Sequence, residues 1–114
     1  MLVRKGEENV VFRPVRNGNG DIRVANMFGL EETDGRCHLV AELTFQPGES
    51  TGIHDHTTDV EVMYMIEGEL VCLEDDGKEY VLKAGDITST AKGNKHYAIN
   101  KSDKPAKVLA VVIA

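Results

Sequence analysis

The sequence of 114 residues lacks features that mark several classes of protein. No apolar run approaches the roughly 20 residues of a membrane-spanning helix, and residues 1–12 contain no apolar core of signal-peptide length. Basic residues are outnumbered, with 13 Lys and Arg against 19 Asp and Glu, a formal net charge of −6. Because nucleic acids and anionic membranes attract basic surfaces, we expect neither as a partner. Because residues 1–12 do not resemble a signal peptide, we expect a cytoplasmic protein.

Nucleophilic chemistry is also poorly represented. The chain has only two cysteines, Cys37 and Cys72, which we expect to be reduced and mostly buried, although the sequence leaves a disulfide open. None of Ser50, Ser89 and Ser102 lies in a G-x-S-x-G elbow. The chemistry of the protein is therefore expected from other residues, among which the four histidines are the best candidates.

Short apolar–polar alternations fill the chain, and no stretch shows a sustained 3.6-residue repeat. Turn-forming residues separate these segments, as at residues 17–20 and 75–77. The pattern predicts an all-β, antiparallel barrel or sandwich made of one domain, residues 1–114. We expect strands at residues 9–15, 22–28, 37–45, 52–56, 61–66, 70–73, 79–82, 87–90, 96–100 and 107–114.

Three of these strands carry further expectations. Pro14 makes the first strand an edge or bulged strand, because proline cannot donate a ladder hydrogen bond. The last strand, 107–114, is apolar at successive positions, so both of its faces need cover. A second subunit on one face would make a homodimer, and the alternative is a strand between two sheets of one monomer. In the strand 37–45, His38 is expected to point outward and five apolar residues to face the core: Cys37, Leu39, Ala41, Leu43 and Phe45.

The stretch from residue 48 to residue 68 carries two histidines one residue apart, His54 and His56, and a glutamate, Glu61. On an extended strand, side chains two residues apart point to the same face, so both imidazoles aim at one point. A short loop through residues 57–59 would let Glu61 approach the same point. Imidazole nitrogens and a carboxylate that converge inside a sheet are typical ligands of a divalent transition metal.

A fourth ligand is expected from the stretch 85–100. This stretch begins with a strand after Gly85, turns at residues 91–94 and continues with a second strand that starts at His96. A hairpin of this kind can bring His96 to the metal from a neighbouring strand. The sequence therefore predicts one metal site with four ligands: His54, His56, Glu61 and His96.

Together the two stretches resemble the motifs of the cupin family. The first family motif, G-x5-H-x-H-x4-E-x6-G, is matched in full over residues 48–68. The second, G-x5-P-x-G-x2-H-x3-N, is matched over residues 85–100, except that Ala91 stands where the family has a proline that would stiffen the turn. The resemblance implies a jelly-roll barrel, that is, a double-stranded β-helix, with one metal in its interior.

The resemblance also implies a chemistry. It favours manganese, iron or nickel, while ligand type alone also permits zinc or copper. Three neutral imidazoles and a carboxylate would leave a divalent ion with a formal charge of about +1 and with open positions for a small anion. Cupins with this ligand set include dioxygenases, oxalate decarboxylases and sugar isomerases. We therefore expect a metal-dependent enzyme, an oxidoreductase, decarboxylase or isomerase, on a small acidic or oxygenated substrate. The alternative is a cupin that binds or senses a small molecule without turnover.

Residues around the ligands are harder to assign. Asp55 and Asp59 flank the ligands but could point to solvent. No general acid or base, and hence no catalytic residue, can be named from the sequence. Four side chains are expected to line a substrate pocket, two on the strand of Glu61 and two on the strand before His96, although the methionines among them could simply fill the core: Met63, Met65, Thr88 and Thr90.

Overall fold

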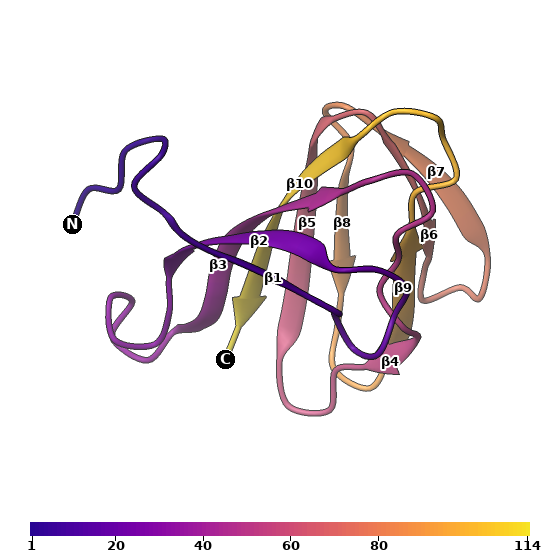
Figure 1. Ribbon diagram of the computed structural model, residues 1–114. Coiled ribbons are helices and arrows are strands. Elements are labelled where there is room, and N and C mark those ends of the chain that lie inside the picture. The colour runs from indigo at the N-terminus through magenta and orange to yellow at the C-terminus, as the bar shows by residue number, and fades with distance from the viewer.

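The computed structural model describes residues 1–114 and consists of ten strands joined by turns and loops, with no helix (Figure 1). The all-β prediction is confirmed, and each predicted strand is present with ends that differ by no more than two residues. The chain contains no helix long and apolar enough to cross a membrane. The strands are β1 (Asn9–Arg13), β2 (Ile22–Phe28), β3 (Cys37–Phe45), β4 (His54–Asp55), β5 (Val60–Glu67), β6 (Glu69–Leu73), β7 (Glu79–Lys83), β8 (Ile87–Thr90), β9 (Lys95–Ile99) and β10 (Ala106–Ile113).

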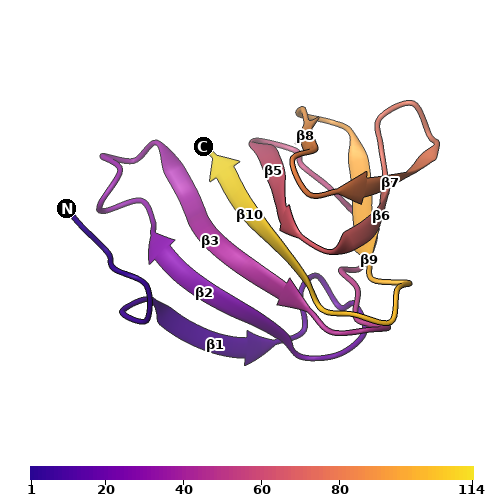
Figure 2. The same cartoon turned by 90° about the horizontal axis from the view of Figure 1, so that it is seen from above.

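These strands form two antiparallel sheets that enclose one core (Figure 2). The large sheet has six strands in the order β1-β2-β3-β10-β5-β8, and the small sheet has four in the order β4-β9-β6-β7. The last strand, β10, lies between β3 and β5, so strands that are distant in sequence become neighbours. This arrangement confirms the predicted double-stranded β-helix, the jelly-roll barrel.

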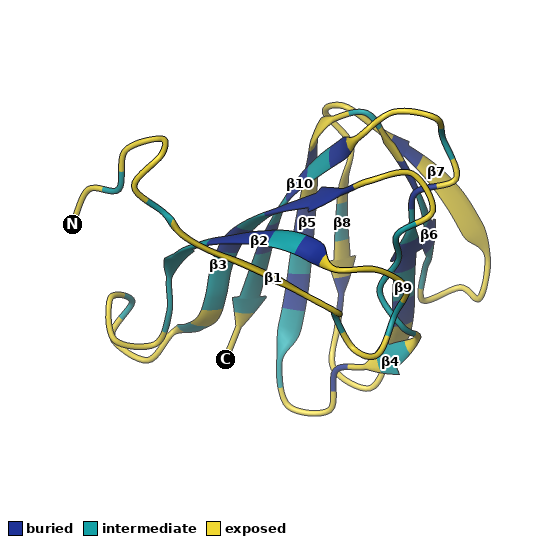
Figure 3. Cartoon of the chain, viewed as in Figure 1, coloured by how far each residue is buried: buried dark blue, intermediate teal, exposed yellow.

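The core lies between the sheets and follows the alternation along each strand. On β3, Ala41, Leu43 and Phe45 are buried as predicted, and Leu39 packs against them while partly exposed. Figure 3 shows buried residues on strands of both sheets, among them β2, β5, β6 and β10, while β1 is exposed along its whole length. The largest fully buried side chains are Phe45, Ile22, Met65 and Leu70. The core is therefore made by the middle of the barrel and not by its edge.

The edge of the large sheet matches the prediction from Pro14. Strand β1 is the outermost strand and ends at Arg13, directly before the proline. A proline there costs no ladder hydrogen bond, because the pairing with β2 has already ended. The chain leaves the sheet at this point and turns back through residues 14–21, which lie beside the candidate site.

The predicted hairpin between residues 85–90 and 96–100 is wrong. Strand β8 pairs with β5 in the large sheet, whereas β9 pairs with β4 and β6 in the small sheet. The turn after β8 thus carries the chain from one sheet to the other, so that two strands consecutive in sequence lie in different sheets. His96 still reaches His54, which stands directly opposite it in the pairing of β4 with β9.

The first glycine and the last asparagine of the two motifs meet in one turn. Gly48 has a φ of 86°, a conformation that favours glycine, and its N–H donates to the Asn100 carbonyl at 2.8 Å. The Asn100 N–H donates in return to the Glu49 carbonyl at 2.9 Å. The buried Asn100 amide also donates to the carbonyl oxygens of Phe45 and Lys104. These bonds brace the segment that leads into β4.

Candidate metal centre

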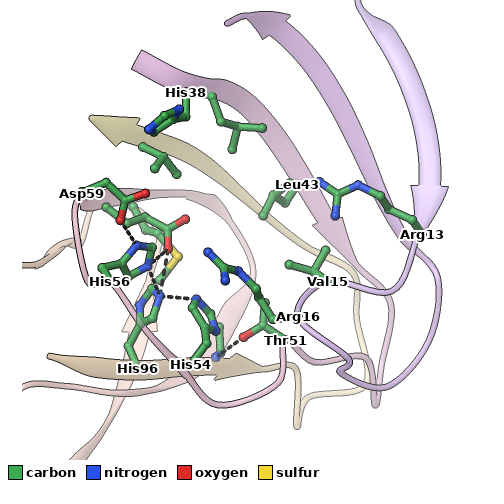
Figure 4. A pocket seen from close by; sticks show the side chains of 15 residues that line it. Arg13, Val15, Arg16, His38, Leu43, Thr51, His54, His56, Asp59 and His96 are labelled. Carbon is green, nitrogen blue, oxygen red and sulfur yellow. Dashed lines mark hydrogen bonds and ion pairs between the residues drawn. The ribbon is translucent and has the colours of Figure 1, made fainter. Parts of the chain in front are cut away.

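Three strands and one turn bring the four predicted ligands together inside the barrel (Figure 4). His54 begins β4, His96 lies on β9, and His56 follows directly after β4. These three belong to the small-sheet side, whereas Glu61 arrives on β5 from the large sheet. The four residues, called here the His/Glu group, therefore join the two sheets.

The side chains of the His/Glu group point at a common centre. The Nε2 atom of His96 lies 2.8 Å from Nε2 of His54, 2.9 Å from Nε2 of His56 and 2.8 Å from Oε1 of Glu61. The four ligand atoms all lie within 4.8 Å of one another. His56, Glu61 and His96 are buried, and His54 is half-buried. The residues predicted from the two motifs are thus assembled into one compact group.

The imidazoles of His54 and His56 are each fixed through their second nitrogen. Nδ1 of His54 lies 2.7 Å from the carbonyl oxygen of Gly52, and Nδ1 of His56 lies 2.5 Å from Oδ1 of Asp59. A carbonyl and a carboxylate can only accept a hydrogen bond, so Nδ1 is the donor in each case. In a neutral ring this leaves a lone pair on Nε2, the atom that faces the common centre.

His96 completes the pattern, since its Nδ1 lies 3.0 Å from the hydroxyl of Thr90, which can accept. Without a metal, Nε2 of His96 donates a hydrogen bond to Glu61. With Nδ1 as the donor in all three rings, by contrast, three Nε2 lone pairs and the Glu61 carboxylate surround one point. Such a set repels itself unless a cation lies among its atoms, and metal-bound imidazoles usually donate their other N–H to an acceptor in this way. The donor set fits a divalent transition metal, and the group could hold one ion.

The charge states of Glu61 and His54 agree with such a role. Burial alone would raise the pKa of Glu61, but the hydrogen bond from His96 and the charges of the imidazoles outweigh it and hold the pKa below its usual value. Burial lowers the pKa of His54; the hydrogen bond to Gly52 opposes this, and the charges of His96 and Arg16 reinforce it. At neutral pH the two groups are therefore a carboxylate and a neutral imidazole, the forms that bind metal.

A cavity of about 420 Å³ opens beside the His/Glu group (Figure 4). This volume is in the range of small-molecule sites. Its inner wall consists of His54, His56, Asp59, Glu61, Met63 and His96. Its outer wall, from β1, the turn after it and β3, includes Arg13, Val15, Arg16, His38, Leu39 and Leu43.

Of the four side chains expected to line the pocket, only Met63 lies in the wall of this cavity. Met65 is fully buried in the core, farther along β5, and Thr90 is buried against His96. Thr88 lines a separate cavity beside the turn between β6 and β7. The alternation along a strand assigns these side chains to the inner face, but it carries no information on how far along the barrel they lie.

Several site residues were not predicted from the sequence. Asp59, which could have pointed to solvent, is bonded to His56. His38 is exposed, in agreement with its expected outward direction, yet it lies at the rim of the cavity. Arg13 and Arg16 line the same outer wall without having been singled out. An acid three residues after a ligand could have identified Asp59, but the arginines come from a turn whose place depends on the tertiary fold.

Known proteins are similar to this chain in sequence and in fold. The family model for the cupin domain matches residues 41–112, a range that includes the whole His/Glu group. An oxalate-binding protein of Thermotoga maritima is 33% identical over 99 residues, which cover 87% of this chain and 81% of that protein.

Two solved structures show the same barrel. A predicted oxalate decarboxylase from Thermotoga maritima has a TM-score of 0.92 at 32% identity, over 99% of this chain and 98% of the other. A protein with a double-stranded β-helix domain from Klebsiella pneumoniae has a TM-score of 0.71 at 26% identity, over 87% and 82% of the two chains. The likeness thus extends to the strands that carry the His/Glu group.

Proposed function

Because the chain belongs to the cupin family, we propose that it binds one divalent transition metal and holds a small dicarboxylate, such as oxalate, on that ion. The metal ligands are His54, His56, Glu61 and His96. The observation that carries the proposal is the convergence of three Nε2 atoms and one carboxylate oxygen on one point. The oxalate-binding relative supports the choice of ligand.

A metal in this place would supply a Lewis acid with open positions for the oxygens of an anion. The chain's own residues keep the ligands aligned, because Asp59 and Thr90 hold the rings of His56 and His96 through their outer nitrogens. Manganese, iron and nickel are the metals we propose first, and the mixed nitrogen and oxygen ligands would also accept zinc or copper.

Binding without turnover is favoured by the acids of the cavity. Only two carboxylates line it, Asp59 and Glu61, and both are engaged by imidazoles. No free carboxyl group therefore stands beside the His/Glu group to exchange a proton with a substrate, which general acid–base catalysis would need.

A metal-dependent decarboxylase is the second candidate function, and His38 is the observation that favours it. Its imidazole lies in the outer wall of the cavity, across from the His/Glu group. Histidine is the side chain that most often exchanges protons near neutral pH. The likeness to the predicted oxalate decarboxylase supports this candidate.

Elemental mass spectrometry on untagged protein, purified without added metal, tests the metal site. We expect about one equivalent of metal in the wild type and its loss in the His54→Ala/His96→Ala variant. Calorimetry with oxalate on the metal-loaded protein then tests ligand binding. An assay for formate and carbon dioxide separates binding from decarboxylation, because a pure binding protein releases neither.

The opposite results are equally clear. No metal in the wild type after incubation with manganese, iron or nickel would remove the metal site. Turnover of oxalate that depends on His38, measured with His38→Gln, would replace the binding protein by the decarboxylase.

We also propose a homodimer through the outer face of the large sheet. On β10, Val108 and Ala110 face the core, so Leu109 lies on the outer face, opposite Tyr64. Tyr64 in turn pairs with Ile87, and these two side chains are 44% and 65% exposed. This row of apolar side chains crosses three neighbouring strands and is a suitable surface for a second copy.

Light scattering at micromolar concentration tests the dimer, and a monomer would remove it. We expect Tyr64→Lys to weaken the dimer. Tyr80→Lys is the matched control, because Tyr80 is 46% exposed but lies on β7 of the small sheet.

A further inference from the structure

The outer wall of the cavity carries two positive charges without an acidic partner. Arg13 ends β1, and Arg16 lies in the turn that follows. The ion pairs of the structure join imidazoles to Asp59 and Glu61, and neither arginine has a carboxylate within 4.0 Å. Both acids of the cavity are thus committed to the inner wall, while both guanidinium groups are free to bind an anion.

The turn that carries Arg16 is fastened to the segment before β4. The carbonyl oxygen of Val15 accepts a hydrogen bond from the Gly52 N–H at 3.1 Å. The carbonyl oxygen of Asn19 accepts one from the Ser50 N–H at 3.0 Å. Arg16 lies between these two attachment points, so its backbone has a defined place.

Close backbone contact fixes this place further. A Cβ atom at Gly52 would lie 2.0 Å from the carbonyl oxygen of Arg16, so a side chain does not fit there. Arg16 itself has a φ of 53°, a left-handed conformation that residues with a side chain avoid. Its neighbours therefore hold it in a conformation that a free turn would rarely adopt. Because Gly52 precedes His54 by two residues, the position of Arg16 is tied to that of a metal ligand.

The side chain of Arg16 points toward the His/Glu group. Figure 4 shows it reaching into the cavity toward His54, whereas Arg13 extends toward Leu43, farther from the group. Arg16 is exposed at the cavity mouth, and its positive charge is one of those that lower the pKa of His54. A ligand held by the His/Glu group would therefore meet this guanidinium at its other end.

We propose that Arg16 determines ligand specificity, binding the second carboxylate of a dicarboxylate whose first carboxylate lies at the metal. This inference rests on the proposed function. A guanidinium donates two parallel N–H bonds to a carboxylate, a geometry that a lysine ammonium does not reproduce. A monocarboxylate held at the metal has no second charge to offer, so Arg16 favours dianions over monoanions.

Three variants of the full chain test the proposal. Arg16→Gln removes the charge. Arg16→Lys keeps the charge but loses the planar guanidinium group that donates two parallel hydrogen bonds. Arg4→Gln is the control, since it changes the net charge equally at an exposed residue that does not line the cavity. Manganese affinity and thermal unfolding are measured first for each protein, so that loss of the metal or of the fold is recognised.

The readout is the ratio of oxalate affinity to acetate affinity, measured by calorimetry on manganese-loaded protein. We expect Arg16→Gln to weaken oxalate binding about 10- to 100-fold, the contribution of a charge-assisted carboxylate pair, and to weaken acetate binding less than about threefold. Arg16→Lys should fall between wild type and Arg16→Gln. Arg4→Gln should leave the ratio unchanged.

The outcomes separate this inference from the proposed function. A wild type that binds no manganese rejects both. Normal manganese binding with an unchanged ratio in Arg16→Gln rejects the role of Arg16 alone, and so does an equal loss of oxalate and acetate. If Arg16→Gln proves unfolded, the wild-type ratio in Arg16→Lys rejects the bidentate pair and a reduced ratio supports it.

Discussion

The inner and outer walls of the cavity differ in how deeply their side chains are buried and in how firmly these are held by hydrogen bonds. Every ligand of the inner wall is buried or half-buried, comes from a paired strand or directly follows one, and is held through a second hydrogen bond or ion pair. The outer wall comes from the last residue of β1, from the turn after it and from β3, and three of its side chains, Arg13, Arg16 and His38, are exposed. The residues of the inner wall are therefore constrained by their partners, while the exposed side chains of the outer wall can change without disturbing the core.

This difference suggests a division of roles. Replacing a ligand of the inner wall removes a charge or a lone pair from a buried group whose other members then lack a partner. Replacing an exposed side chain of the outer wall changes mainly what a small molecule meets when it enters the cavity. Substitutions in the two walls should therefore have effects of different size and kind, as follows.

The largest contrast is between two histidines. His96→Ala should reduce manganese affinity by more than about a thousandfold, because its Nε2 lies within 2.9 Å of three other ligand atoms. His38→Ala, in the outer wall, should retain about one equivalent. Elemental mass spectrometry and calorimetry measure both, and equal loss of metal in the two variants would remove the distinction between the walls.

The contact between the walls should be sensitive to a single methyl group. In Gly52→Ala the new Cβ would collide with the backbone of Arg16, so we expect the free energy of unfolding to fall by about 2–4 kcal/mol. Gly29→Ala is the matched control, because its nearest neighbour would be 3.7 Å away. Urea unfolding compares the two, and a loss in Gly52→Ala no greater than in the control would show that the turn is loosely attached.

The hydrogen bond from His56 to Asp59 can be tested by comparing Asp59 with Asp55, an aspartate at the end of β4. Asp59→Asn removes the charge that holds the His56 ring, and we expect about tenfold weaker manganese binding. Asp55→Asn should leave the affinity within about twofold, since Asp55 is exposed and outside the cavity. Metal titration by calorimetry decides, and equal effects of the two changes would point to general electrostatic attraction.

The smallest effect concerns Cys72, which is fully buried in the core. The thiols of Cys37 and Cys72 are both free, and burial, with the charges of Glu74 and Glu61, raises the pKa of Cys72 from 9.0 to about 12. Between these values the unfolded chain loses the thiol proton while the folded chain keeps it. The free energy of unfolding should therefore fall with rising pH above 9, by at most about 1.4 kcal/mol per pH unit from this group.

Urea unfolding of wild type and Cys72→Ala at pH 8 and pH 10 isolates this contribution. Other groups titrate in both proteins, so the difference in their pH dependence belongs to Cys72. The stability of the wild type should fall more steeply than that of the variant. An equal pH dependence of stability in the two proteins would mean that water reaches the Cys72 thiol in the folded state.

The inner wall was also the part that could be predicted from the sequence. Its ligands lie in two short motifs, and the spacing of His54 and His56 is a local property of extended chain. The strands themselves follow from local alternation and turn residues. The four residues of the His/Glu group could therefore be named from the amino-acid sequence alone.

The outer wall was not predictable by the same means. Arg16 reaches the cavity because the turn after β1 docks onto Gly52, a contact between segments that local patterns do not link. The prediction of a hairpin between β8 and β9 was wrong for the same reason, because two strands that are close in sequence can join different sheets. The depth of Met65 and Thr88 likewise depends on how the barrel closes around them.

The pairing of β4 with β9 also bears on the order in which the molecule folds. Only two residue pairs join these strands, yet they bring together His54 and His96, which are 42 residues apart. Forming this two-residue pairing closes a long loop of the chain. The loss of entropy is unfavourable until other contacts have brought the two strands together. The His/Glu group should therefore form late, on a barrel that is almost complete. A bound ion would therefore mainly lower the unfolding rate, and it would raise the folding rate much less.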